Sequence, residues 1–135
     1  MPRRRWRSNM PAESRAILFV SEFKLRSFRD VPRMFRCSSA VFRQIKHSDG
    51  AFRCDLRAQI LRKTFHTRSL WRDAAAIQAF VHTEPHTSAM RALHPTYTTA
   101  AFAQTPLATL TDYPTWSGVV AMLASPNAHR IDAPV

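Results

Sequence analysis

The sequence predicts an α+β fold in which strands and helices follow the order β-α-β-β-α-β. Four segments alternate apolar and polar residues, a pattern typical of strands in a partly buried sheet. Between the first two segments, and again between the last two, apolar residues recur at the spacing of a helix. This is the order of a ferredoxin-like fold, a four-stranded antiparallel sheet with two helices on one face.

The first strand is expected over residues 16–26, where both faces begin with apolar side chains. That pattern indicates a strand covered on two sides. The next helix opens at Asp30 and Pro32, since proline is tolerated in the first helical turn, and runs to about His47. Gly50, in the run SDG, lies beyond its end.

The second strand is expected over residues 51–60, and the third over residues 65–71, which read FHTRSLW. Only a short turn separates them, so the two strands should form an antiparallel hairpin. In the third strand Phe65, Ser69 and Trp71 fall on one face, because side chains alternate along a strand.

A helical region follows the third strand. Asp73 is placed to cap its first turn, and the alanines after it favour a helix. Pro85 interrupts this helix because proline has no N–H to donate to the preceding turn. His86 and Met90 then fall four residues apart in a new helical segment, on the same stripe as two aliphatic residues. The imidazole is therefore expected to point inward, and the fourth strand follows over residues 97–105.

An inward histidine has several interpretations. His86 is a core residue hydrogen-bonded to a nearby carbonyl or hydroxyl, a general base in a pocket, or an axial ligand to haem iron. Trp71 is likewise either a packing residue at a strand end or an aromatic wall for a planar ligand. The residue pattern leaves these alternatives open.

The domain organisation follows from these elements. Residues 15–105 are expected to form one ferredoxin-like domain. Residues 1–14 are basic and without periodicity, and they are expected to be a disordered tail. Residues 106–135 form a proline-containing extension, in which residues 116–123 mark one short amphipathic helix that packs back on the domain or across a dimer.

A sheet with helices on one face leaves its other face bare. In a chain of 135 residues this would present a broad, partly apolar surface to water. The expected cover is the same face of a second copy, so we expect a homodimer.

The net charge of +11 raises the possibility of an anionic partner. The basic tail and the first helix are the candidate nucleic-acid contacts, but a solvated tail and a solvated helix face explain them better. The chain has no apolar run long enough to span a membrane, and we expect a cytoplasmic location without membrane contact. Cys37 and Cys54 lack metal-ligand spacing and are expected to be free, buried thiols.

Metal and nucleotide sites are not expected. His82 and His86 are four residues apart with Glu84 between them, but Pro85 breaks the helix that would align them as metal ligands. The chain contains two glycines, so a glycine-rich phosphate loop cannot form.

The chain from about residue 16 to residue 105 resembles the dimeric α/β-barrel superfamily. This superfamily includes the antibiotic-biosynthesis monooxygenases, and the likeness is to an uncharacterised branch close to spheroidene-monooxygenase-like proteins. The resemblance is carried by short runs in register: SDG at Ser48 to Gly50, FHTRSLW at Phe65 to Trp71, AFV at Ala79 to Val81, and EPH at Glu84 to His86 with Met90 and Arg91.

The resemblance implies that two protomers pair their sheet faces into a barrel, with the ligand between sheet and helices. Cofactor-independent monooxygenases of this kind orient an electron-rich aromatic substrate, which is deprotonated and then reacts with oxygen. Haem-degrading members place a tryptophan after the third strand and a histidine on the second helix. Both kinds use an early asparagine, for which Ser21 or Glu22 stands here. The resemblance implies His86 as the catalytic base, with Trp71, Phe65, Ser69, Phe23 and Met90 around the substrate.

Three functions are therefore carried forward. The first is a monooxygenase-like protein that oxidises a small aromatic or apolar metabolite without a cofactor. The second is a non-catalytic binding protein for haem or a hydrophobic small molecule. The third, less favoured, is a basic nucleic-acid-associated protein.

Overall fold

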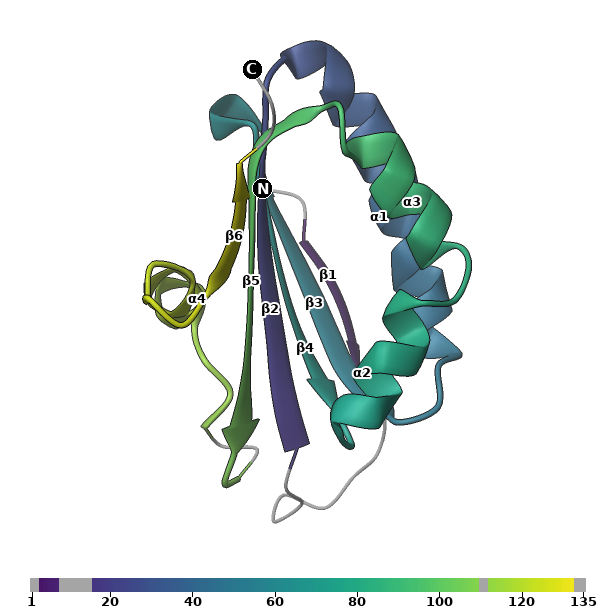
Figure 1. Cartoon of the computed structure of the whole chain (residues 1–135), viewed down its shortest axis with the longest axis vertical. Coiled ribbons are helices and arrows are strands. Elements are labelled where there is room, and N and C mark those ends of the chain that lie inside the picture. Colours follow the sequence, from purple (N-terminus) through teal and green to yellow (C-terminus); the bar gives the residue numbers. More distant parts are fainter. Residues whose placement is uncertain (1–2, 8–15, 110–111, 133–135) are drawn as a thin grey trace.

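The computed structural model describes residues 3–7, 16–109 and 112–132. These residues form one antiparallel sheet in the strand order β1-β3-β4-β2-β5-β6. Helices α1, α2 and α3 cover one face of the sheet, and α4 lies on the opposite face (Figure 1). The strands are β1 (Arg3–Arg7), β2 (Ala16–Leu25), β3 (Ala51–Gln59), β4 (Thr64–Trp71), β5 (Tyr97–Leu107) and β6 (His129–Asp132), and the α-helices are α1 (Val31–Lys46), α2 (Ala74–Val81), α3 (His86–Leu93) and α4 (Trp116–Leu123).

The predicted ferredoxin-like unit is confirmed. Its four strands lie side by side in the order β3-β4-β2-β5, and each neighbouring pair is antiparallel. β3 and β4 form the expected hairpin through a short 3-10 turn, which ends at Lys63 in the left-handed conformation (φ 52°). The Asp73 carboxylate caps α2 by accepting a hydrogen bond from the Ala76 N–H at 2.8 Å, as the sequence predicts.

The prediction of a four-stranded sheet is incomplete. β1 adds to the outer edge of β3, with Arg3 opposite Arg57 and Arg7 opposite Arg53, and β6 adds to the outer edge of β5. The first of these segments was expected within a disordered tail. Both are short edge strands that gain backbone hydrogen bonds from a strand already in place, and such a strand needs little apolar periodicity of its own.

Gly50 makes the turn from α1 into β3. Its φ of +83° lies in the left-handed region, and a Cβ added there would lie 2.7 Å from the Cβ of Ala76. A residue with a side chain would therefore be strained by its backbone and would collide with the start of α2. This close approach brings the turn after α1 against the N-terminal end of α2.

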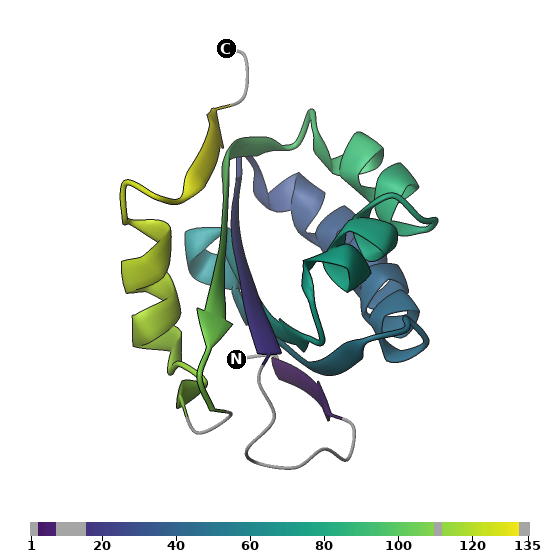
Figure 2. The same ribbon diagram turned by 60° about the horizontal axis from the view of Figure 1, so that its bottom comes forward.

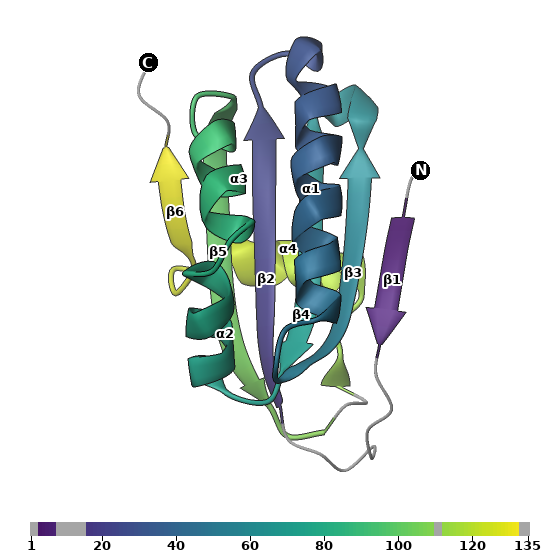
Figure 3. The ribbon, with the colours of Figure 1, turned by 90° about the vertical axis from the view of Figure 1, so that its right-hand side faces the viewer.

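The first core layer lies between the sheet and helices α1 to α3. In Figure 3, α1 lies in front of the sheet and runs along its strands, while α2 and α3 lie over its β5 and β6 side. Met34, Phe42 and Ile45 are the buried residues of α1, and they belong to the apolar stripe expected for this helix. Phe65 and Trp71 of β4 are buried opposite the helices.

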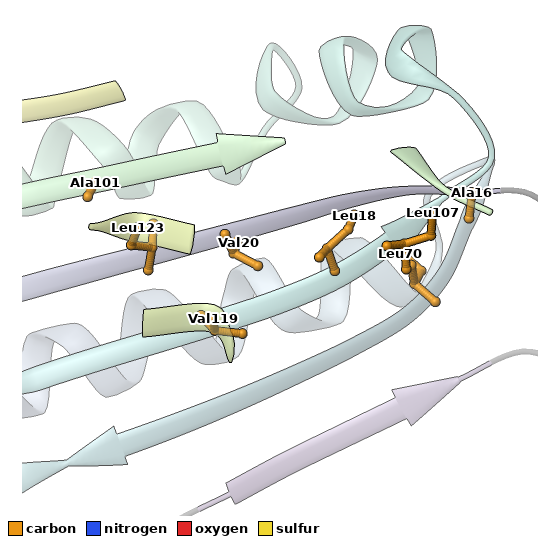
Figure 4. Close-up of a cluster of buried hydrophobic side chains, with 8 residues drawn as sticks. All are labelled: Ala16, Leu18, Val20, Leu70, Ala101, Leu107, Val119 and Leu123. Carbon is orange, nitrogen blue, oxygen red and sulfur yellow. The ribbon is translucent and has the colours of Figure 1, made fainter. Parts of the chain in front are cut away.

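The second face of the sheet is not bare, and that expectation is wrong. α4 packs against it, on the side away from the other helices (Figure 2). Val119 and Leu123 of α4 are buried with Leu18 and Val20 of β2 in one apolar cluster, which also includes Leu70 (Figure 4). The C-terminal extension therefore supplies at least part of the cover that a second copy was expected to provide.

A buried ionic network fixes the segment that leads into α4. The Asp55 carboxylate on β3 accepts hydrogen bonds from Arg68 Nε at 2.9 Å and from the Tyr113 hydroxyl at 2.9 Å. Arg68 also donates to the Pro114 carbonyl, and its guanidinium lies 4.3 Å from the ring centroid of Trp116. A buried arginine of the sheet thus contacts three residues of the C-terminal segment, so polar as well as apolar contacts hold α4 in place.

Among the described residues, no helix is both long enough and apolar enough to cross a membrane.

The burial of α4 gives a stability prediction. Leu123 is 2% exposed and Val120, three residues before it, is 42% exposed. Leu123→Ala should lower the free energy of unfolding by about 2–5 kcal/mol, because it removes buried methyl groups and leaves a cavity. The matched change Val120→Ala should cost less than about 0.5 kcal/mol. Urea unfolding of both variants measures this, and equal effects would mean that α4 is not packed on the sheet.

Candidate functional site

A cavity of about 90 Å³ lies between the sheet and helices α1 to α3. Its wall is mostly aliphatic and aromatic, with Phe19 and Phe23 from β2, Met34 from α1 and Leu93 from α3 among its residues. A site of this volume exceeds the space that one water molecule needs, about 10–15 Å³. The position is the one that the resemblance implies for a ligand.

Five of the predicted site residues come together at this cavity. Phe23 reaches it from β2, Phe65 and Ser69 from β4, and His86 and Met90 from α3. They lie on the same side of the sheet because alternate residues of a strand share a face. Residues far apart in the sequence therefore form one wall, as the periodicity predicts.

Trp71 does not line the cavity. Its side chain is completely buried at the end of β4, its ring lies 4.9 Å from that of Phe80, and its Nε1–H donates to the Ser69 hydroxyl at 2.8 Å. Phe80 and Ser69 do line the cavity. Of the two interpretations of Trp71, the structure therefore favours the packing residue, which supports the cavity wall from behind.

The His86 ring is held by contacts with Val81 and Phe80. Nδ1 lies 3.1 Å from the Val81 carbonyl oxygen, and the ring packs edge-on against Phe80 at 4.8 Å. A carbonyl accepts hydrogen bonds only, so Nδ1 carries the proton in the neutral ring. Nε2 then holds the lone pair, and no described residue makes a hydrogen bond to it.

Burial lowers the pKa of His86 below its ordinary value of 6.5. Desolvation of the cation is the main cause; the Val81 carbonyl opposes it, and the charge of nearby His82 adds to it. The ring is therefore neutral at pH 7. A neutral imidazole with a free Nε2 lone pair at an apolar cavity is chemically a general base.

Gln44 on α1 holds the junction between α2 and α3, and the sequence analysis missed it. Its side-chain amide donates to the carbonyls of Phe80 and Thr83, each at 3.1 Å, and its oxygen accepts from the His86 N–H at 2.8 Å. These bonds span about forty residues of sequence. Gln44 lies on a polar position of a helix, so no sequence pattern distinguishes it from a solvated residue.

Three hydroxyl groups of the cavity come from strands β2 and β4, and the Ser38 hydroxyl of α1 is another. The hydroxyls of Ser21 and Thr67 are hydrogen-bonded to each other, and Ser69 donates to the Phe19 carbonyl at 3.3 Å. Ser21 lines the cavity, whereas Glu22 points to the other face and pairs with His66 at 2.8 Å. Of the two candidates for the early asparagine position, only Ser21 reaches the ligand side.

Both cysteines are free and both line the cavity. Cys54 is buried and Cys37 is partly buried. Burial raises the pKa of the Cys54 thiol to about 12, with the Asp55 charge adding to the effect. Cys54 is therefore a neutral thiol at pH 7 and serves as a small apolar wall residue rather than a nucleophile.

The inner cavity alone does not fit haem. A porphyrin is much larger than 90 Å³, although His86 Nε2 has the chemistry of an axial ligand. For metal ions, no group of three histidine, cysteine or acidic side chains comes together within the described part of the chain.

The basic N-terminal residues are partly engaged within the protein. Arg4 donates to the Ser39 hydroxyl at 2.8 Å and lies over the Phe42 ring, and Arg5 pairs with Asp55 at 3.3 Å. These two guanidinium groups belong to the contacts of strand β1, which explains part of the local charge without a nucleic-acid partner.

Comparison with solved structures confirms the resemblance at the level of the fold. The chain is similar to SnoaB, a cofactor-independent oxygenase from Streptomyces nogalater, at 14% identity and a TM-score of 0.55 over 70% of this chain and 92% of SnoaB. A putative antibiotic biosynthesis monooxygenase from Nitrosomonas europaea matches at 10% identity and a TM-score of 0.60, over 80% of this chain and 99% of the other.

A dimeric ferredoxin-like protein of unknown function from Thermobifida fusca matches at 12% identity and a TM-score of 0.60, over 73% of this chain and 97% of the other. No family model matches the sequence, and no curated protein matches it. The three structures are covered almost completely while 20–30% of this chain is not, so this chain adds segments to the shared fold.

His66, which is buried, and His86, which is partly buried, predict a loss of stability in acid. Burial is the main cause that lowers the pKa of both His86 and His66 below 6.5. As the pH falls below that value, the unfolded chain takes up protons that the folded rings resist, so unfolding becomes more favourable. Urea unfolding should show lower stability at about pH 5.5 than at about pH 7.5. In an NMR titration, a His86 midpoint at or above 6.5 would contradict the assignment.

Proposed function

We propose that this protein binds a small aromatic or apolar molecule in the cavity beside His86 and oxidises it with molecular oxygen, without a bound cofactor. The observation that carries the proposal is the arrangement of His86 itself: a neutral ring with its Nε2 lone pair free, at a cavity with largely apolar walls. The fold shared with SnoaB, described as a cofactor-independent oxygenase, supports the same chemistry.

In this reaction His86 Nε2 removes a proton from an acidic C–H or O–H group of the substrate. The resulting anion is electron-rich and acts as the reductant, while oxygen is the oxidant. For an activated CH₂ group, one oxygen atom ends in the new C=O group and the other leaves as water with the two hydrogens. The apolar wall, including Phe23 and Phe65, positions the ring of the substrate and limits the access of water.

The second candidate is a binding protein without catalysis. The observation that favours it is the scarcity of polar groups in the cavity, where Ser21 and Thr67 already satisfy each other. Binding requires only the cavity, whereas oxidation also requires the His86 base. The two candidates therefore differ in what His86 substitutions do.

His86→Gln tests the oxidation. Removing a general base should lower the rate of oxygen uptake with phenolic or anthrone-like compounds by about 10²- to 10⁴-fold, while leaving binding of the same compounds largely intact. The control is His82→Gln, because His82 is an exposed histidine near the same helix junction. Oxygen uptake that is equal in wild type and in both variants would leave only the binding function.

We also propose assembly as a homodimer in the cytoplasm, where the free thiols Cys37 and Cys54 would remain reduced. The described neighbour from Thermobifida fusca is a dimeric ferredoxin-like protein, which supports the first part. Because α4 covers part of the second sheet face, the contact between copies is expected to include α4, whose Val120 is exposed.

Sedimentation measures the assembly. A dimer should have twice the mass of the 15.5 kDa chain. If the protein sediments as a single chain at all accessible concentrations, α4 has replaced the second copy entirely, and the homodimer prediction is wrong.

A further inference from the structure

A second hollow adjoins the cavity. It has a volume of about 490 Å³ and shares four wall residues with the cavity: Phe19, His86, Met90 and Phe102. It lies where α2 and α3 pass over the β5 and β6 edge of the sheet (Figure 3). His86 therefore lies at the boundary between a small inner space and a larger outer one.

The two spaces differ in the chemistry of their walls. Beyond the shared residues, the outer hollow is lined by three aliphatic residues, Ile77, Val81 and Ala103. Four polar residues also line it: Gln78 of α2, Gln104 of β5, Asn127 before β6 and His129 of β6. All four are exposed, and none of their side chains makes a hydrogen bond to another described residue. Amide side chains carry both donors and acceptors, so they can pair with hydroxyl and carbonyl groups of a ligand.

Charge is absent from both walls. The chain has 20 basic residues and 9 acidic ones, yet no lysine, arginine, aspartate or glutamate lines the cavity or the outer hollow. A site for a phosphate or a carboxylate would be expected to contain at least one lysine or arginine, whose side chain is charged at neutral pH. The absence of such a group from these walls, in a strongly basic protein, indicates a neutral ligand.

The inner cavity and the outer hollow also differ in volume. A cavity of about 150 Å³ is known to hold benzene, and the inner cavity here is about 90 Å³. An aromatic ligand larger than the inner cavity would extend past His86 and place its remaining atoms in the outer hollow. The part that enters the outer hollow meets three amide side chains beside the aliphatic side chains of Ile77, Val81 and Ala103.

We infer that the ligand is a neutral amphipathic molecule. Its aromatic or apolar head lies in the inner cavity beside His86, and a tail with several hydroxyl or carbonyl groups is bound by Gln78, Gln104 and Asn127. This inference rests on the proposed use of the cavity and adds the chemical class of the ligand. Asn127 and His129 lie beyond the ferredoxin-like unit, so the C-terminal extension contributes to specificity as well as to stability.

The test compares three probes that share one aromatic head: phenol, phenyl β-D-glucoside and phenyl β-D-glucuronide. Binding to the full-length protein is measured by NMR titration. The glucoside should bind more tightly than phenol, by roughly two- to tenfold for each hydrogen bond gained. The glucuronide should bind more weakly than the glucoside, because no lysine or arginine lines either space to pair with its carboxylate.

Variants of the outer hollow test where the tail of the ligand binds. Gln104→Ala and Asn127→Ala should each weaken glucoside binding by roughly two- to tenfold and leave phenol binding unchanged. Gln59→Ala is the matched control, since Gln59 lies at the end of β3 and lines neither space; it should change neither affinity.

Each outcome of these experiments tests one part of the proposal. If phenol binds and the glucoside binds no better, or if the glucuronide binds best, the amphipathic assignment is overturned while the cavity function stands. If phenol and the glucoside both fail to perturb the resonances of His86, the cavity is not a binding site and both proposals fall. If His86→Gln abolishes oxidation but the Gln104 and Asn127 variants treat all probes alike, only the tail subsite is lost.

Discussion

The structure depends on one constraint: the central strand β2 carries apolar residues on both faces, and each of these faces must be removed from water. β2 directs Phe19 and Phe23 toward helices α1 to α3, and Leu18 and Val20 toward α4. Burying a side chain of this size contributes about 1.5–3 kcal/mol, so neither face can be left exposed in a small domain without a large loss of stability. The first face is covered by the helices of the ferredoxin-like unit. The second face is covered by α4. The chain after α4 then brings Asn127 and His129 to the edge of the outer hollow.

The same alternation separates charge from the cavity. On β4, Ser69 lines the cavity, while Arg68 points to the other face and pairs with Asp55. The neighbouring His66 also points away from the cavity, and its Nε2 lies 2.8 Å from the Glu22 carboxylate. The Arg68–Asp55 pair therefore lies on the side of the sheet away from the cavity, where the Tyr113 hydroxyl donates to Asp55. No lysine, arginine, aspartate or glutamate lines the cavity. A one-residue shift in the register of β4 would exchange the two sets and place a guanidinium in the cavity.

Much of the fold could be predicted from the sequence because its signals are local. Alternation and helical spacing indicate the four central strands and the helices, and the inward direction of His86 follows from the same stripe as Met90. The remaining elements depend on contacts between distant parts of the chain, which a sequence pattern does not show. β1 and β6 are strands only because an edge is available to pair with them, and α4 lies against the sheet through a network centred on Asp55, which in the sequence is one acidic residue among alternating arginines. Trp71 was expected at the cavity because the resemblance implied it there. Strand alternation gives the face of a residue but not its depth, and Phe80 packs against the Trp71 ring.

The environment of His86 limits the chemistry it can perform. His66 shows what a carboxylate partner does in this protein: Glu22 raises the pKa of His66 against the effect of burial. His86 has a backbone carbonyl in place of a carboxylate, and burial lowers its pKa. It is therefore a weaker base than a histidine of a carboxylate-supported dyad, and it gains little help in holding a proton. A weak base is sufficient when the substrate is itself acidic, as phenols and CH₂ groups beside aromatic carbonyls are, because the charge left behind spreads over the ring. Under the proposed function, the protein needs to supply only an apolar cavity, one lone pair and a fixed orientation. Gln44 would provide the last of these by holding the backbone at His86.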